Sequence, residues 1–220
     1  MSGRSRIPDQ GASSRQANPT HAGPRIDLED LWSQSRSGAR NVAGVTYQVA
    51  VTGLLLAEAL DGTLPISFVS PEGLDDVECR LTDGSFLLVQ CKEREAGLGR
   101  LTTADIASVI SRAARAALSL GNTRIVLVTD AELGSGLQFT GWDSSIAATH
   151  PSDRLQEVVR HVRDVEVRDA QQLVEQASLV HLEWDLASRT RVLLASRLGI
   201  APSLAHLVHA RLMEDLSEVS

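Results

Sequence analysis

Acidic, amide and ammonium side chains gather at the ends of two neighbouring apolar segments of this 220-residue sequence. Asp75 and Asp76 stand just before the first segment, and Gln90 and Lys92 close the second. Carboxylate and amide oxygens are the hard ligands that Mg²⁺ prefers. A nearby ammonium can offset charge on a phosphate or orient the water that attacks it. The pattern therefore indicates metal-assisted chemistry on a phosphate ester.

Lys92 is the one lysine of the sequence, and the other twenty basic side chains are all arginine. Arginine stays protonated in proteins and presents a wide planar fork, whereas lysine presents a compact ammonium that can lose its proton. We interpret Lys92 as a residue whose chemistry requires that compact ammonium.

A β-hairpin is predicted to carry these residues. Residues 76–82 alternate between apolar and polar side chains, as expected for a half-buried strand, and residues 86–92 form a second, largely apolar strand. The sequence TDGS, residues 82–85, contains an Asp-Gly pair, which is a strong signal for a tight turn between antiparallel strands.

The alternation of side chains along each strand decides which of them can meet. Asp76 and Glu78 lie on one face of the first strand, and Gln90 and Lys92 lie on one face of the second. Because a four-residue turn pairs the two strands directly, we expect these polar faces to share one side of the sheet. Strand parity favours Asp76 over Asp75 as the acid of this site.

The order of the other predicted elements indicates an α/β protein with a mixed sheet. A helix over 44–60, either buried or packed on a sheet, and a strand over 66–70 precede the hairpin. Thr102 and Asp105 resemble a capping box at the start of the next helix, and a near-continuous apolar strand follows at 124–130. A helix, three strands, a helix and a strand in this order are typical of layered α/β folds.

Three regions are predicted along the chain. Residues 1–25 are rich in Ser, Gly, Pro and Arg, so we expect a disordered tail. Residues 26–150 hold the candidate site. Residues 151–220 are mainly helical, with two further strands predicted at 164–169 and 179–186. This last region is expected to complete the core domain, to mediate oligomerisation or to link the core to a sensor.

Composition limits the range of functions. The formal net charge of −7 argues against a protein coated in basic surface, although a local basic groove is compatible with it. Aromatic residues make up 3%, which disfavours base stacking as the main binding mode. Cys79 and Cys91 lie in apolar segments and are interpreted as buried, reduced thiols. No stretch reaches the roughly 18 apolar residues of a membrane span and no signal peptide is apparent, so we expect a cytoplasmic protein without membrane contact.

The segments GVTYQVAVTGLLLAEAL, EGLDDVE and VQCKE together resemble the PD-(D/E)xK superfamily of nucleases. More specifically, they resemble the Cap4-like dsDNA-nuclease domain at the N-terminus of bacterial antiphage effectors, among them CBASS effectors and NTPase-linked defence proteins. The resemblance covers roughly residues 38–135. It implies a restriction-endonuclease-like mixed central sheet flanked by helices, with residues 26–150 as the nuclease core and a helical C-terminal extension.

The resemblance also implies roles by position. Asp76, or its neighbour Asp75, would bind the metal, Gln90 would be the second ligand, and Lys92 would be the catalytic lysine. Gln90 departs from the Asp or Glu of many superfamily members, and an amide there makes the metal site less charged.

Further candidates lie around the hairpin: Gln48 reaching the site from the first helix, the backbone carbonyl of Cys91 as a metal ligand, and Glu72 and Glu78 as accessory acids. In the loop after the second strand, Arg94 and Arg100 are predicted to contact DNA phosphates.

The function implied is that of a DNA endonuclease that uses Mg²⁺ or Mn²⁺, cleaves double-stranded DNA and serves as the effector of an antiphage system. Because one centre of this kind cuts one strand, we expect activation by assembly into a homo-oligomer. A nucleotide-sensing or NTPase sensor, as a further domain or subunit, is the expected partner. The alternative is a catalytically silent module of the same fold that binds DNA or a partner protein.

Overall fold

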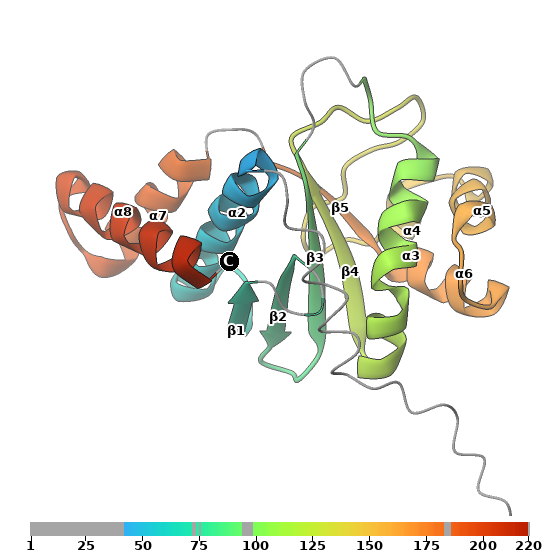
Figure 1. Cartoon of the computed structure of the whole chain (residues 1–220), viewed down its shortest axis with the longest axis horizontal. Helices are drawn as coiled ribbons and strands as arrows, with labels where there is room; N and C mark the ends of the chain where they lie inside the picture. Colours follow the sequence, from blue (N-terminus) through green and yellow to red (C-terminus); the bar gives the residue numbers. More distant parts are fainter. Residues whose placement is uncertain (1–41, 72–73, 75, 94–98, 183–185, 220) are drawn as a thin grey trace, which may run out of the picture.

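A five-stranded mixed sheet lies at the centre of the computed structural model (Figure 1). The structure describes residues 42–71, 74, 76–93, 99–182 and 186–219. In spatial order the strands are Ile66–Pro71 (β1), Val77–Leu81 (β2), Phe86–Lys92 (β3), Thr123–Thr129 (β4) and Ser178–His181 (β5). Strands β1 to β3 pair antiparallel, whereas β3, β4 and β5 pair parallel. The predicted α/β class and mixed sheet are confirmed, and the restriction-endonuclease-like assignment stays a prediction.

Helices cover both faces of this sheet. Those of the described residues are Val42–Asp61 (α2), Thr103–Leu120 (α3), Ile146–Thr149 (α4), Ser152–His161 (α5), Val167–Gln176 (α6), Leu186–Leu198 (α7) and Pro202–Val219 (α8). Figure 1 shows α3 with α5 and α6 on one side of the sheet, and α2 with α7 and α8 on the other. The chain therefore forms a three-layer arrangement with the sheet in the middle.

Two apolar cores result from the alternation of side chains along the central strands. Leu88 and Ile125 project into the core beneath α3, whereas Val89 and Val126 project into the core beneath α2. Strands buried on both faces read as continuous apolar segments, as β4 does. Cys79 is buried in the second of these cores.

Helix α2 is apolar on nearly all sides because it lies between the sheet and the α7–α8 pair. A Cβ atom at Gly53 would meet the terminal methyl group of Met213, so the glycine leaves room for that α8 side chain against α2. On the same helix the buried carboxylate of Glu58 forms an ion pair with Arg189 of α7. These contacts confirm the prediction of a buried helix in this segment.

The helical character of the C-terminal region is confirmed, but the strand predicted over 164–169 is wrong. Asp164 has a φ of 64°, and α6 begins soon afterwards at Val167. The alternation of valines with charged residues suggested a strand. Buried Ala170, Leu173 and Val174 follow helical spacing instead, and packing of that face against the core decides the outcome.

Other sequence predictions lie outside the described residues or differ from the structure in the extent of an element. The predicted tail over 1–25 lies outside the described residues. The strand predicted over 179–186 is shorter, ending at His181, and the single turn α4 was not predicted. Within the described residues no single helix is long and apolar enough to cross a membrane. The bent pair α7 and α8 meets the criteria of length and composition only across a 115° bend.

Candidate active site

The β2–β3 hairpin brings the predicted site residues together. Val77 pairs with Val89, and Glu78 pairs with Leu88, across a turn of four residues. One step further along this register, Asp76 lies opposite Gln90, and their side chains are in hydrogen-bond contact. The expectation that the polar faces of both strands share one side of the sheet is therefore confirmed at this pair.

Asp76 is held by two donors from β3. Its Oδ2 atom accepts a hydrogen bond from the backbone N–H of Cys91 at 2.8 Å and another from the side-chain amide of Gln90, which is 3% exposed. Burial raises the pKa of Asp76, while the Cys91 and Gln90 hydrogen bonds and the positive charge of Arg112 oppose that rise. The buried carboxylate is thus incompletely compensated, and a bound cation would stabilise its ionised form.

The Tyr-Gln pair of α2 fixes two strand ends. The Nε2 group of Gln48 donates to the backbone carbonyl of Asp76 at 2.6 Å, and Gln48 is 8% exposed. The neighbouring Tyr47 hydroxyl donates to the carbonyl of Leu182, just beyond β5, at 3.1 Å. Gln48 does reach the site, but it contacts the backbone of Asp76, so its role in this geometry is to position that residue.

Lys92 ends β3 and faces the start of α3. Its Nζ lies 3.3 Å from Oδ1 of Asp105, and its backbone carbonyl accepts a hydrogen bond from the Thr129 hydroxyl at 2.6 Å. The predicted capping box is confirmed, since Thr102 and Asp105 satisfy each other's backbone N–H groups. Burial raises the pKa of Asp105, but the Thr102 hydrogen bonds and the Lys92 charge outweigh it and lower that pKa to about 2.

The donors around Asp76 fit a hard cation. Among the described residues no three His, Cys, Asp or Glu side chains gather as a metal cluster. The oxygens at hand are the Asp76 carboxylate, the Gln90 amide and the Cys91 carbonyl. That carbonyl lies on the same side of β3 as the Cys91 N–H bound to Asp76, because both groups of a strand residue point the same way.

Gln90 presents its NH₂ group to Asp76, and a half-turn of the amide would present Oε1 instead. A set of oxygen donors suits Mg²⁺ or Mn²⁺, which keep several waters in such sites. The described residues therefore fit a divalent cation, with part of its coordination left to water or substrate.

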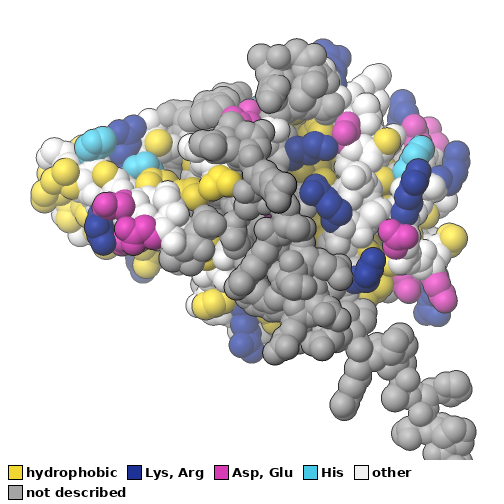
Figure 2. Space-filling view, in the orientation of Figure 1, with side chains coloured by type: hydrophobic (Ala, Val, Ile, Leu, Met, Phe, Trp, Pro, Cys, Tyr) yellow, Lys and Arg dark blue, Asp and Glu magenta, His cyan; other side chains and the backbone are white. Residues whose placement is uncertain are grey.

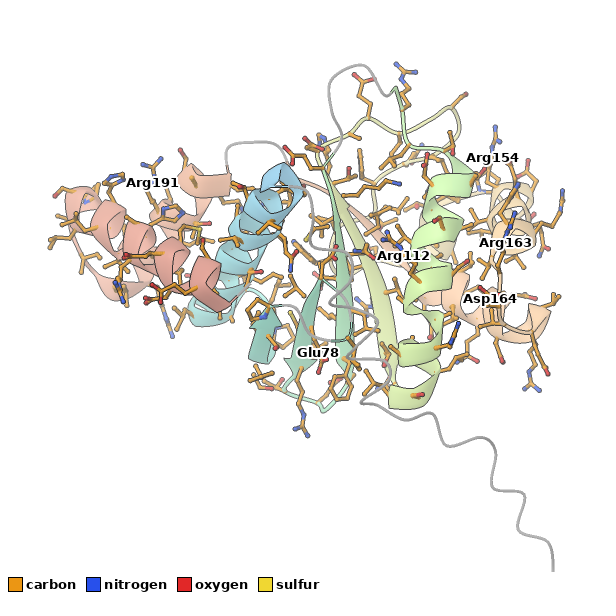
Figure 3. All side chains as sticks on the ribbon, in the orientation of Figure 1. Glu78, Arg112, Arg154, Arg163, Asp164 and Arg191 are labelled. Carbon is orange, nitrogen blue, oxygen red and sulfur yellow. The ribbon has the colours of Figure 1, made fainter. Side chains whose placement is uncertain are left out.

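Of the remaining predicted residues, some lie outside the described residues and the others make contacts away from Asp76. Asp75, Glu72 and Arg94 lie outside the described residues. Glu78 is one alternation further along β2 than Asp76, and its carboxylate accepts a weak hydrogen bond from the backbone of the preceding loop (Figure 3). Arg100 forms an exposed ion pair with Glu132 at 2.9 Å.

Two residues near the site were not predicted to belong to it. Asp105 was recognised as a helix cap, but nothing in the sequence connected it with Lys92. Arg112 is labelled in Figure 3 on α3, and its charge acts on Asp76. Seven residues separate it from Asp105, so a helical face shared with the cap was the one available signal.

No protein-family model matches the sequence, and no curated protein is significantly similar to it. Solved structures do share its fold. The Cap4 SAVED/CARF-domain containing receptor of Acinetobacter baumannii, with the cyclic trinucleotide 2'3'3'-cAAA, aligns with a TM-score of 0.57 and 16% identity, over 83% of this chain and 42% of that one. The corresponding receptor of Moraxella osloensis aligns with a TM-score of 0.52 and 18% identity, over 82% of this chain and 44% of that one.

The chain thus spans less than half the length of the receptors that it matches. At these identities the likeness establishes a common fold. The α/β layers and the mixed sheet of this chain therefore have counterparts in the Cap4 receptors. The shared fold alone assigns neither an activity nor a ligand to this chain.

Proposed function

We propose that this chain is a metal-dependent DNA endonuclease of the PD-(D/E)xK type. The observation that carries the proposal is the contact of the Asp76 carboxylate with the Gln90 amide and the Cys91 N–H, at adjacent strand ends, with Lys92 next in the chain. Acid, amide and ammonium in this order on a β-hairpin are the arrangement that the resemblance implies.

Each residue has a defined part in this proposal. Asp76, Gln90 and the Cys91 carbonyl would hold the cation, and Gln48 fixes the backbone of Asp76. A bound Mg²⁺ would supply Lewis-acid activation of the phosphate and of an attacking water. Lys92 places a compact positive charge beside the phosphate and orients that water.

We further propose that the nuclease is the effector of a bacterial antiphage system. The fold shared with the Cap4 receptors and the resemblance to effector nucleases support this role. Activation by assembly, through a sensor domain or subunit, would keep the enzyme from cutting host DNA. Cleavage per chain is then expected to rise with protein concentration or with enforced dimerisation.

A second candidate function is ligand sensing. One structurally similar receptor is described with the cyclic trinucleotide 2'3'3'-cAAA, which favours a cyclic oligonucleotide as the ligand. Isothermal titration of the full chain with that trinucleotide at two temperatures tests this candidate: saturable binding supports it, and the absence of heat at both temperatures rejects it. The cleavage assay separates a catalytically silent DNA-binding module of the same fold from the nuclease, and the titration separates it from the sensor.

The decisive experiment is cleavage of supercoiled plasmid DNA with Mg²⁺ or Mn²⁺, against the same reaction in EDTA. The wild-type chain is expected to cut only with metal. Lys92→Ala should lower the rate about 10²–10³-fold, as removal of a charge-stabilising group does, and Lys92→Arg should not restore it. Full activity in a folded Lys92→Ala protein would remove the basis of the assignment.

A further inference from the structure

Helix α3 carries its charge on one exposed face. The charged residues of α3 are Asp105, in its first turn, and the exposed arginines Arg112 and Arg115. The other residues of its outer face are small, hydroxylic or apolar. Beyond its first turn, α3 is therefore purely basic, although the whole chain is acidic.

Neither guanidinium on α3 has an ion-pair partner within the described part of the chain. Four other arginines of the described residues do have one: Arg100, Arg154, Arg189 and Arg211. The side chains of Arg112 and Arg115 are both exposed, so among the described residues their guanidinium groups are open to a ligand.

Helical spacing aligns these side chains with the candidate site. Asp105 and Arg112 are seven residues apart and Arg115 is three further on, so all three share one side of α3. At 1.5 Å per residue they span about 15 Å. The Lys92 ammonium lies at the Asp105 end, and the charge of Arg112 acts on Asp76.

The figures show the same arrangement. In Figure 2, Lys and Arg side chains, in dark blue, follow one another across the middle of this face, where Figure 1 draws α3. Figure 3 labels Arg112 in that region. A row of separate basic side chains therefore leads along α3 toward the strand ends that hold the site.

We infer that Lys92, Arg112 and Arg115, called here the α3 row, bind phosphates of double-stranded DNA and lead one strand to Asp76. The inference rests on the proposed function, which makes DNA the substrate. About 15 Å of duplex axis carries roughly four phosphates on one strand at 3.4 Å per base pair, which is enough for each of the three cations to contact one. Scarce aromatic residues disfavour stacking of single-stranded bases and so favour a duplex.

Binding of a fluorescent 20-base-pair DNA to the full-length chain tests this inference, with anisotropy measured at several salt concentrations in EDTA and again with Ca²⁺. Arg112→Ala and Arg115→Ala should each reduce the slope of log affinity against log salt by about 0.9, and so weaken binding about eightfold at 0.1 M relative to 1 M salt. The double variant should lose both contributions. Arg197→Ala, an exposed helical arginine on α7, is the matched control and should bind as wild type does.

The outcomes separate this inference from the proposed function. Wild-type affinity in the double variant, an equal loss in Arg197→Ala, tighter binding of duplex RNA, or no binding of duplex DNA in either buffer would overturn the α3 row. Plasmid cleavage that persists while the double variant binds normally leaves the nuclease standing without the row. Binding that depends on Arg112 and Arg115 with no cleavage by any variant leaves the row standing and rejects the nuclease.

Discussion

The ammonium of Lys92 lies 3.3 Å from Oδ1 of Asp105, while Oδ2 of the same carboxylate accepts from the backbone N–H and the hydroxyl of Thr102. One carboxylate therefore holds the candidate catalytic lysine and caps helix α3. The position of Lys92 is tied to the start of the helix that carries the basic row. The two tasks use different oxygens, so substitutions can separate them.

Asp105→Asn should slow DNA cleavage about 3–30-fold while the protein stays folded. The amide keeps an oxygen acceptor for Thr102 but loses the charge that orients Lys92. Thr102→Ala is the matched control: it should cost about 1 kcal/mol of stability as a lost cap and leave the cleavage rate of the folded protein unchanged. Plasmid-nicking rates and melting temperatures measure the two effects, and an Asp105→Asn variant that cleaves at the wild-type rate would show that Lys92 needs no anchor.

Lowering the pH should destabilise the fold, in part because Asp105 becomes protonated. Its pKa lies at about 2 in the folded chain, against an ordinary value of 3.8. The stability that it contributes is therefore present above pH 3.8 and is lost as the pH falls through about 2. Urea unfolding between pH 5 and 2 should show a smaller loss of stability in Asp105→Asn than in the wild type. Parallel curves for the two proteins would contradict this assignment.

Asp76→Asn should abolish cleavage and yet stabilise the metal-free protein at neutral pH. Burial raises the pKa of Asp76 above its ordinary value of 3.8, so ionising this carboxyl costs more free energy in the folded chain than in the unfolded one. The stability that this group contributes is full below pH 3.8 and is lost as the pH rises through the folded-state pKa. The amide removes the buried charge but can still accept from Cys91 and Gln90.

Thermal melts in EDTA and in Mg²⁺ measure this effect. In EDTA at pH 7 the Asp76→Asn variant should melt higher than wild type, by about 2–4 °C for each kcal/mol of relieved desolvation. Mg²⁺ should raise the melting temperature of wild type only. Equal stabilisation of both proteins by Mg²⁺ would place the cation at another site.

Gln48→Leu should destabilise the fold by about 1–3 kcal/mol, because the carbonyl of Asp76 would lose its buried donor. Cleavage in the remaining folded protein should also fall, since Asp76 would lose its fixed position. Thr52→Val, which removes a hydroxyl bonded to the carbonyl of Gln48 within the same helix, is the control and should leave cleavage intact. A Gln48→Leu protein with normal cleavage would restrict Gln48 to a structural role.

Arg189→Ala should destabilise the docking of α7 on α2. It leaves the Glu58 carboxylate, whose side chain is 2% exposed, without its cation. Loss of one partner of a buried pair costs about 3–5 kcal/mol. Because the Arg189 side chain is half exposed and screened by water, we expect Arg189→Ala to lower the free energy of unfolding by a smaller amount, about 1–3 kcal/mol. Chemical unfolding measures this, and a neutral effect would show that packing alone holds α7 in place.

Much of the candidate site followed from local sequence. The period of two along residues 76–82 and 86–92, with an Asp-Gly turn between them, settles which side chains share a face, because a hairpin pairs neighbours in the chain. Thr102 and Asp105 likewise predicted a helix start, since a capping box involves four consecutive residues. The same kind of local alternation misled at 164–169, where packing against the core favoured a helix.

What the sequence determined by itself was the hairpin, the order of acid, amide and lysine, and the resemblance that these imply. Only the tertiary structure brought Asp105 to Lys92, the Gln48 amide to the Asp76 carbonyl, and Arg112 within electrostatic reach of Asp76. These contacts depend on how α2 and α3 dock on opposite faces of the sheet. Docking is decided by burial of apolar faces formed by residues far apart in the chain, which local patterns do not specify.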